Sequence, residues 1–245
     1  MGSRKRITAA ATAAAALFVC APGAVAAPAG DARGGAQWLL FSGSDVWRNG
    51  SFFHGGLLWS PDGLDREGFT LKAVISGGRY RYISGALGNV EVTGRELAAQ
   101  IMPGARFKRG KLEIKVFAGL DIQDHSLSPD DPSSDLRGGD IGARLAFDLW
   151  HEPTPQIMLA ADGSLSSIAG SYSARVAAGW RLFNRFYAGP EAQAFASEDY
   201  RQTRIGLHLT GFKTGALEWS LAAGWADDND GRDGLYGRFG VSARH

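Results

Sequence analysis

Four residues in the C-terminal half of the chain have side chains suited to acid–base or nucleophilic chemistry. They are His208, Glu191, Glu218 and Ser220, and all fall in the row of alternating segments that we predict to face inward. A histidine oriented by a carboxylate, with a serine close by, is the arrangement that many hydrolases and acyltransferases use. The sequence therefore raises the hypothesis of a lipid-modifying enzyme.

The same inward row supports a second interpretation, a network of ion pairs. Its charged members are Arg144, Arg175, Arg204, Glu191 and Glu218. Charged groups placed together inside a fold commonly neutralise one another without any catalytic role. A lipid hydrolase also needs its nucleophile where lipid can reach it, which a deep inward row does not provide. We therefore predict a structural network here and no catalytic residue.

Two further histidines lie outside that row in the sequence-based interpretation. His54 is near a predicted hairpin and His125 is in a predicted long loop, and neither has an evident partner. We expect both to be solvated.

Aromatic residues are candidates for sugar contact, because their faces stack on sugar rings. Most of the seven Trp and six Tyr fall near predicted strand ends, where anchoring at a membrane interface explains them. Tyr80, Tyr82 and Tyr200 lie in or beside predicted outer loops, which often carry recognition. The predicted binding residues, in the lumen or outer loops, are Tyr80, Tyr82, Arg144, Arg175, Glu191, Tyr200, His208 and Glu218.

Oxygen ligands for a cation occur in two glycine-containing loops. Asp130-Asp131 lies in one, and the run from Asp227 to Gly231 in the other. The second run resembles part of a calcium-binding loop but lacks the distal glutamate of an EF-hand. We therefore predict solvated loops, no metal site and no cofactor.

The elements that must position these side chains are β-strands. In the segment 171–181, an apolar row with an aromatic at each end (Tyr172 and Trp180) alternates with a small and polar row that contains Arg175. Side chains alternate across a strand, so such a segment presents one face to hydrocarbon and the other to water. Aromatic residues at strand ends are typical of the interfacial girdles of transmembrane barrels.

This pattern repeats along the chain and predicts about twelve strands. The segments are 37–47, 51–60, 68–80, 90–104, 111–124, 138–149, 156–165, 171–182, 186–196, 203–212, 216–226 and 234–242. Asn49-Gly50 predicts a tight first hairpin, because both residues tolerate positive φ. The longer connections, 78–89, 124–137, 164–170, 197–202 and 227–233, fall on one side, as in outer-membrane barrels. We predict an all-β, antiparallel, up-and-down transmembrane β-barrel.

The N-terminus has the layout of a secretory signal peptide. Basic residues at 4–6 precede an apolar run, and small residues end at Ala26. We predict a signal peptide at 1–27, a flexible segment at 28–36 and a single barrel domain at 37–245. Cys20, the one cysteine, leaves with the signal, so the mature chain has no disulfide.

Composition agrees with a barrel and excludes some partners. Removing the signal leaves 23 of the 26 basic residues against 25 acidic ones, and without a clustered basic face we predict no nucleic-acid partner. The 34 glycines and a mean hydropathy near zero are consistent with strands that have one of their two faces in water. A soluble β-sandwich or lipocalin-like barrel is the alternative. Charged residues at the centres of the polar rows favour the membrane barrel.

Several stretches resemble the cellulose biosynthesis protein BcsS family. They are Phe41–Trp47, Gly56–Pro61, Gly63–Lys72 and Ala188–Gln193, and the overall pattern extends over the mature chain. The resemblance implies a non-enzymatic protein of the Gram-negative outer membrane that assists cellulose biosynthesis or secretion. Its partners would be outer-membrane lipid and cellulose or cellulose-secretion components. A lipid-modifying enzyme (lipase, deacylase or acyltransferase) and a general porin or structural barrel remain the alternatives.

Overall fold

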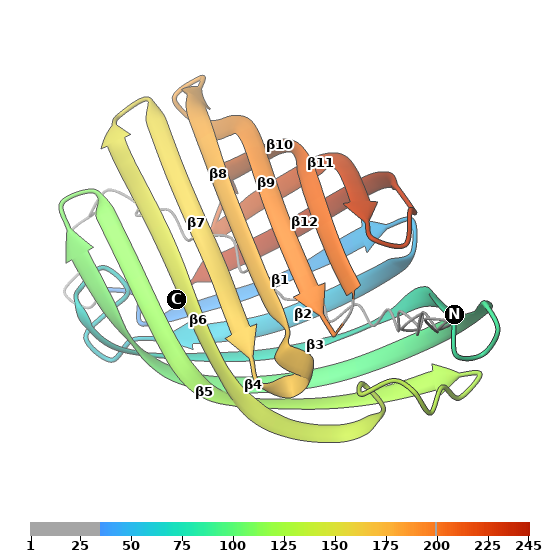
Figure 1. The fold of residues 1–245 in the computed structure, drawn as a ribbon. Helices are drawn as coiled ribbons and strands as arrows, with labels where there is room; N and C mark the ends of the chain where they lie inside the picture. The colour runs from blue at the N-terminus through green and yellow to red at the C-terminus, as the bar shows by residue number, and fades with distance from the viewer. Residues whose placement is uncertain (1–34, 199) are drawn as a thin grey trace, which may run out of the picture.

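The predicted architecture is confirmed: the chain forms a closed antiparallel barrel of twelve strands (Figure 1). The computed structural model describes residues 35–198 and 200–245. Each strand pairs with its neighbours in sequence, and β1 pairs with β12 to close the wall. Among the described residues, no helix has the length and apolar character needed to cross a membrane. The predicted signal peptide at 1–27 lies outside the described residues, as does most of the segment 28–36.

Each of the twelve alternating segments corresponds to one strand of the barrel. The strands are β1 (Trp38–Trp47), β2 (Gly50–Trp59), β3 (Gly68–Ser84), β4 (Val90–Arg109), β5 (Leu112–Ser128), β6 (Gly138–Thr154), β7 (Ile157–Ser166), β8 (Tyr172–Leu182), β9 (Phe186–Ser197), β10 (Tyr200–Thr214), β11 (Leu217–Asp228) and β12 (Gly234–Arg244), with one short 3-10 helix, η1 (Ile168–Gly170).

The two ends of the barrel differ, and most of the longer connections lie at one end as predicted, with the long connection at 60–67 and the short turn at 48–49 as exceptions. The loop end carries the connections at 48–49, 85–89, 129–137, 167–171 and 229–233. The terminal end carries the C-terminal residue and the first residues of β1, where Gln37 and Trp38 bond to His245. It also carries the connections at 60–67, 110–111, 155–156, 183–185 and 215–216.

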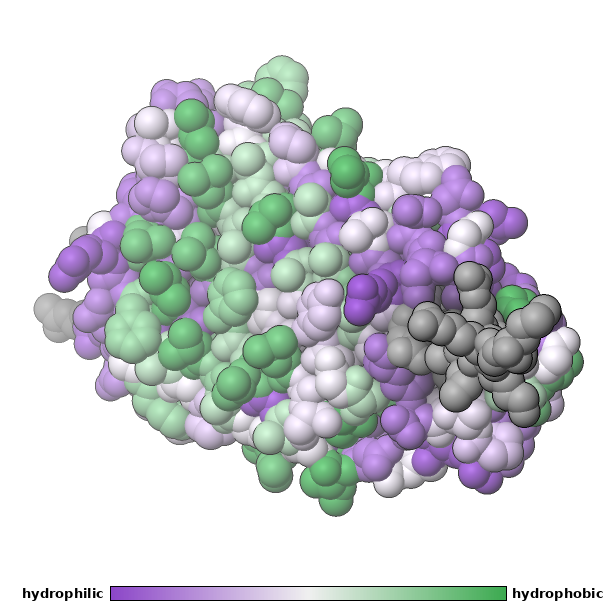
Figure 2. Space-filling model, viewed as in Figure 1, coloured by the Kyte–Doolittle hydropathy of each residue, from purple (hydrophilic) through white to green (hydrophobic). Residues whose placement is uncertain are grey.

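The predicted faces of the strands are also confirmed. On β8, Tyr172, Val176 and Trp180 point outward and are exposed, whereas Ser173 and Arg175 point inward and are buried. Figure 2 shows hydrophobic side chains gathered over the front strands and hydrophilic ones toward the loop end at the right. A soluble barrel buries its apolar row, so this inverted arrangement is that of a barrel wall in lipid.

Four neighbouring strands are longer than the sequence pattern predicts. β3, β5 and β6 have 17 residues and β4 has 20, and together they extend past the other strands at the loop end (Figure 1). Residues 81–84 and 125–128, predicted to be loop, continue β3 and β5. They do so because each keeps pairing with β4 as far as Val90 and Thr93.

The first hairpin exists, but the predicted reason for it is wrong. Arg48 and Asn49 form the turn, and Gly50 already belongs to β2, opposite Trp47. None of the three has a positive φ. Gly50 is needed for another reason, because a Cβ there would collide with the indole ring of Trp47.

Candidate functional site

The inside of the barrel is filled by side chains arranged in layers. The aromatic layer, near the loop end, consists of Trp47, Phe52, Tyr80, Tyr82, Val92, Leu136, Ile168, Tyr200, Ala222, Ala226 and Tyr236. The ionic layer, below it, consists of Asp45, Asp121, Arg144, Asp162, Arg175, Glu191, Arg204 and Arg238. Toward the terminal end, Lys72 pairs with Asp148 at 3.3 Å, and Leu64 of the 60–67 connection is buried against Met102 and Phe117.

The aromatic layer is a stack of rings contributed by adjacent strands. The ring centroids of Trp47 and Phe52 are 6.0 Å apart, those of Phe52 and Tyr80 6.5 Å, and those of Tyr80 and Tyr82 6.3 Å. Offset ring pairs at these distances are favourable beyond their buried area. Each ring occupies an inward position at or near the loop end of its strand, so the strand alternation itself brings the rings together.

The loop 129–137 covers this layer. Its Leu136 is fully buried among the rings, and the Leu136 N–H donates to Oε1 of Glu198 at 2.9 Å. Asp131 is buried as well and accepts hydrogen bonds from the Tyr82 hydroxyl at 3.1 Å and from the Ser133 hydroxyl at 2.6 Å. The loop is therefore anchored to β3 and to the connection after β9.

The charge of Asp131 is favoured by those contacts. Burial by itself raises the pKa of this carboxyl, but hydrogen bonds from Ser133, Ser84 and Tyr82 outweigh burial and hold the pKa below its usual range. The ionised form thus accepts the bonds that hold the loop, in keeping with the strength of hydrogen bonds to charged acceptors.

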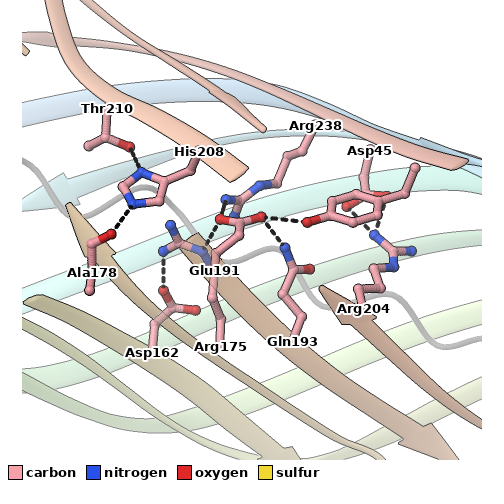
Figure 3. Close-up of polar contacts among 11 residues, drawn as sticks. Asp45, Asp162, Arg175, Ala178, Glu191, Gln193, Arg204, His208, Thr210 and Arg238 are labelled. Carbon is pink, nitrogen blue, oxygen red and sulfur yellow. Dashed lines mark hydrogen bonds and ion pairs between the residues drawn. The ribbon is translucent and has the colours of Figure 1, made fainter. Parts of the chain in front are cut away.

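Glu191 is the centre of the ionic layer (Figure 3). It accepts from Nε of Arg175 at 3.0 Å, from Nη2 of Arg238 at 2.6 Å and from the Tyr236 hydroxyl at 3.0 Å. The Gln193 amide donates to the same carboxylate at 2.6 Å. With its lone pairs used in this way, Glu191 meets the condition under which a buried carboxylate is tolerated.

Two arginines extend the layer. Arg175 also binds Asp162 on β7 at 3.0 Å, so one guanidinium holds carboxylates from the strands on either side of β8. Arg204 binds both oxygens of Asp45, at 2.7 and 2.9 Å. Its guanidinium lies 4.8 Å from the ring centroid of Phe195 and 5.1 Å from that of Trp47, a cation–π arrangement that joins the ionic and aromatic layers.

A chain of polar side chains makes a second link between the layers. Arg144 binds Asp121 at 2.6 Å, and Gln123 donates to the same carboxylate at 2.9 Å. Gln123 in turn contacts His125 at 3.0 Å, and His125 contacts the Tyr80 hydroxyl at 3.3 Å. This chain runs up β5 from the ionic layer to the aromatic layer.

The expectation that His54 and His125 are solvated is wrong. His125 is 2 % exposed, and the Nε2 atom of His54 is buried. Both histidines occupy inward positions of strands, His125 because β5 extends beyond its predicted end and His54 because it lies within β2. The alternation that determines the other inward residues therefore applies to these two as well.

The structure brings some of the predicted site residues together and separates others. Arg175 and Glu191 pair directly, as the network interpretation predicts, whereas Glu218 lies 3.7 Å from Lys213 near the terminal end. Tyr80, Tyr82 and Tyr200 lie on β3 and β10 and are buried in the aromatic layer. Whether any of these residues binds a substrate stays a prediction.

The partners that sequence reasoning missed are Asp45, Asp121, Asp162 and Arg238. All four occupy inward positions of the same alternating rows, so the signal for their orientation was present in the sequence. The pairing varies in how far it reaches along the chain: Asp162 is opposite Arg175 on the adjacent strand, 13 residues away, whereas Asp45 and Arg204 are separated by 159 residues.

Within the described part of the chain, His208 lacks the contact with a carboxylate that the enzyme hypothesis predicts. Its Nδ1 contacts the Thr210 hydroxyl at 3.3 Å, and its Nε2 contacts the Ala178 carbonyl at 3.2 Å (Figure 3). The carboxylate that could have oriented it, Glu191, is bound by two arginines instead. Both ring nitrogens are thus used in contacts, one with a threonine hydroxyl and one with a backbone carbonyl, and neither contact is with a carboxylate.

No group of three or more His, Cys, Asp or Glu side chains suited to a metal ion occurs among the described residues. In the loop with the calcium-like run, Asp230 binds Arg232 at 2.9 Å, and Asp228 lies 3.8 Å from the same arginine. The Asp228 carboxylate also accepts from the backbone N–H of Asp230 and Arg232. These carboxylates therefore have partners within the loop itself.

A cavity bounded by residues that include Lys72, Arg144 and Asp148 has a volume of about 20 Å³, enough for about one water molecule. Side chains that line a wide aqueous pore would be exposed to water, whereas the members of the aromatic layer are buried.

The chain matches the family described as cellulose biosynthesis protein BcsS over residues 39–245. No curated protein matches it. Among solved structures, the barrel is similar to the CymD monoaromatic hydrocarbon channel, with a TM-score of 0.56, 9 % identity, and coverage of 87 % of this chain and 90 % of that chain. It is also similar to an outer membrane channel from Pseudomonas putida F1, with a TM-score of 0.54, 11 % identity, and coverage of 90 % and 100 %. At these identities the likeness concerns the fold alone.

Proposed function

The chain belongs to the cellulose biosynthesis protein BcsS family, and from that membership we propose that it assists cellulose production or release without making or breaking a bond. The observation that carries this proposal is the family match, which covers nearly the whole barrel from Leu39 onward. The fold, a closed barrel with an apolar exterior, is that of outer-membrane channels.

We propose a passive mechanism in which a rigid barrel presents its loops to other components. The buried aromatic layer and the ion pairs beneath it support this mechanism over conduction of a glucan chain through the lumen. A polysaccharide would need a continuous wet path, and opening one would break contacts that several strands share. Planar-bilayer recording with the purified barrel tests this part, because a stable large conductance would contradict it.

A lipid-modifying enzyme on the same fold receives less support. Both ring nitrogens of His208 are engaged by Thr210 and Ala178, so the imidazole is not oriented by a carboxylate as the predicted Glu191 partner would require. The purified barrel should be inert toward phospholipid and lipopolysaccharide. Hydrolysis or acyl transfer that disappears in His208→Ala would overturn this part of the proposal.

Deletion of the gene tests the cellulose role directly. We expect the deletion strain to lose most of its cellulose yield or its surface-attached cellulose, and the wild-type gene to restore it. A gene in which residues 129–137 are replaced by a Gly-Ser segment of equal length should restore the barrel but not cellulose. Normal cellulose in the deletion strain would rule out the role, and pulldown from the complemented strain would identify components that contact the loops.

We propose the outer membrane as the location, reached through a signal peptide at residues 1–27. The exposed apolar exterior supports a membrane location, and the order of basic, apolar and small residues supports export. Membrane fractionation and the N-terminal sequence of the mature protein test both statements. A mature protein that remains folded and monodisperse without detergent would contradict the membrane location.

Glucan contact by the predicted binding residues is also a proposal. Tyr80, Tyr82 and Tyr200 have the aromatic faces that sugar rings prefer, although all three are buried. A cellulose pulldown with the purified barrel, compared with its Tyr200→Ala variant, tests the contact. Equal retention of the two proteins would assign Tyr200 to packing alone.

A further inference from the structure

A group of arginines lies on the outer wall of the barrel at the loop end. Arg79 on β3 and Arg95 on β4 point outward, are exposed and are directly opposite each other in the strand register. Arg81 follows on β3, and Arg48 lies in the turn between β1 and β2. Like charges directly opposite on neighbouring strands are unfavourable, so an anion that bridges Arg79 and Arg95 would stabilise this part of the wall.

A notch beside these arginines results from unequal strand heights. The hairpin of β1 and β2 ends where Gly50 pairs with Tyr80, whereas β3 continues to Ser84. The step leaves a cavity of about 390 Å³ above the hairpin. It is lined by Val46, Trp47, Arg48, Asn49, Gly50, Ser51, Arg79, Arg81 and Thr93. Three guanidinium groups and two hydroxyl-bearing side chains are therefore gathered around one recess.

Hydrogen bonds hold two of the arginines in place. Arg48 donates to the Asp233 carbonyl at 3.0 Å, and Arg81 donates to the Arg48 carbonyl at 3.0 Å. Arg81 also lies 3.7 Å from Glu91, but both side chains are about half exposed, and such pairs contribute little.

The other two arginines have no carboxylate partner within residues 35–198 and 200–245. No ion pair joins Arg79 or Arg95 to an acidic side chain in that part of the structure. Asp124, which also points outward on β5, is opposite Leu97 rather than Arg95. The notch therefore carries a surplus of positive charge and a set of unused N–H donors.

The position of the notch along the barrel axis indicates which part of the membrane it faces. The outward residue next to Arg95 is Leu97, which is 59 % exposed, and the one next to Ser51 is Phe53, which is 63 % exposed. The arginines thus lie at the loop-end edge of the apolar surface. In a barrel embedded in a bilayer, that edge is at the level of the lipid headgroups.

We propose that this notch binds the phosphate of a phosphorylated lipid headgroup in the leaflet around the loop end. A planar guanidinium binds phosphate in a bidentate manner, and two of them across one strand pair can share a single phosphate. Phe53 and Leu97 would contact the acyl chains just below. The proposal requires a membrane location and does not depend on the role in cellulose production.

The test uses the purified, folded barrel in a detergent with a neutral headgroup. Lipid A, its dephosphorylated form and inorganic phosphate are the three ligands, with retention followed by native mass spectrometry and stability by thermal unfolding. The double variant Arg79→Gln/Arg95→Gln should bind lipid A at least about tenfold more weakly, because two charge-assisted contacts are lost. Without lipid A, it should unfold at the same or a higher temperature than the wild type.

A matched control variant loses the same number of positive charges at the terminal end of the barrel. Arg66 and Arg185 are exposed near the terminal end, so Arg66→Gln/Arg185→Gln should bind lipid A like the wild type. Equal binding of lipid A by the notch variant, or equal losses in the two double variants, would overturn the proposal. So would equal binding of the dephosphorylated lipid.

Competition by inorganic phosphate at low concentration would mean a site for the free ion instead. If the double variant does not fold, Arg95→Gln alone is measured against Arg66→Gln.

Discussion

The aromatic and ionic layers lie in the same lumen but stabilise the barrel through different kinds of contact. In the aromatic layer, contacts are non-directional and follow neighbouring strands, as in the series from Trp47 through Phe52 to Tyr80. In the ionic layer they are directional, and some join strands that are not neighbours, as between Glu191 on β9 and Arg238 on β12. Loss of one ring leaves a void, whereas loss of one charge leaves another charge buried without its partner. The ionic layer should therefore tolerate substitution less well.

The largest effect is expected for Arg175→Met. Methionine keeps much of the volume of the side chain but removes the ion pair of Asp162 and leaves Glu191 with Arg238 as its remaining arginine partner. Breaking a buried pair in this way should lower the free energy of unfolding by about 3–5 kcal/mol. Urea unfolding of the barrel in detergent, followed by the mobility difference between folded and unfolded forms on gels, measures the change.

A double variant provides the control for that prediction. Arg175→Met/Asp162→Leu removes one uncompensated charge together with the arginine, so part of the stability should return. If the single and double variants are equally stable, uncompensated charge is not the cause of the loss.

A smaller effect is expected for Tyr82→Phe in the aromatic layer. The ring stays in the stack, but the hydrogen bond to Asp131 is lost, and bonds to charged groups contribute about 1.5–3 kcal/mol. Because Asp131 belongs to the loop 129–137, the change should appear as faster hydrogen exchange and proteolysis in that loop. An effect spread evenly over all strands would contradict the anchoring role of Tyr82.

Gly94→Ala tests how tightly the rings are packed. A Cβ at Gly94 would collide with the buried ring of Tyr80, so the ring must shift, at a cost of roughly 1–3 kcal/mol. Gly237→Ala on β12 is the matched control, because nothing lies within 4 Å of its Cβ position. Equal unfolding midpoints for the two variants would mean that the aromatic layer is loosely packed.

The smallest effect concerns pH and the loop that covers the aromatic layer. The pKa of Asp131 is lower in the folded protein than the ordinary value of 3.8. Its contribution to stability is therefore complete above the unfolded value and is lost as the pH falls through the lower folded value. Proteolysis of the loop should accelerate only below about pH 4, and Asp131→Asn should be cleaved at a pH-independent rate. Acceleration between pH 7 and 5 would point to a different group.

The strand pattern was predictable because it depends on local alternation alone. Segments such as 171–182 needed only the order of apolar and polar residues, and the structure places β8 at Tyr172–Leu182. The extension of β3 through Arg81, Tyr82, Ile83 and Ser84 was not predicted, because the point where a strand ends depends on its partner. They continue the strand since β4 pairs with them. The reason predicted for Gly50 was also wrong because of a contact between strands. Glycine is required there because the ring of Trp47, on the neighbouring strand, leaves no room for a Cβ.

The candidate site was predictable only in part. Orientation toward the lumen follows from position in a row, so Arg175, Glu191 and His208 were placed correctly on the inward face. Partners on strands that are not neighbours in the wall were not placed, because such contacts depend on how the closed barrel brings the strands together. Arg238, which binds Glu191 at 2.6 Å, was therefore missed.

The sequence by itself determined that this chain forms a closed β-barrel with a polar inside and an apolar outside, since alternation with a period of two needs no information beyond the strand. Only the tertiary structure decided which charges neutralise one another, which rings stack, and that the lumen is filled. Those outcomes depend on the register of twelve strands and on where each strand ends. Side chains from opposite walls meet only once the barrel has closed, and the residue pattern within a single strand contains no information about those contacts.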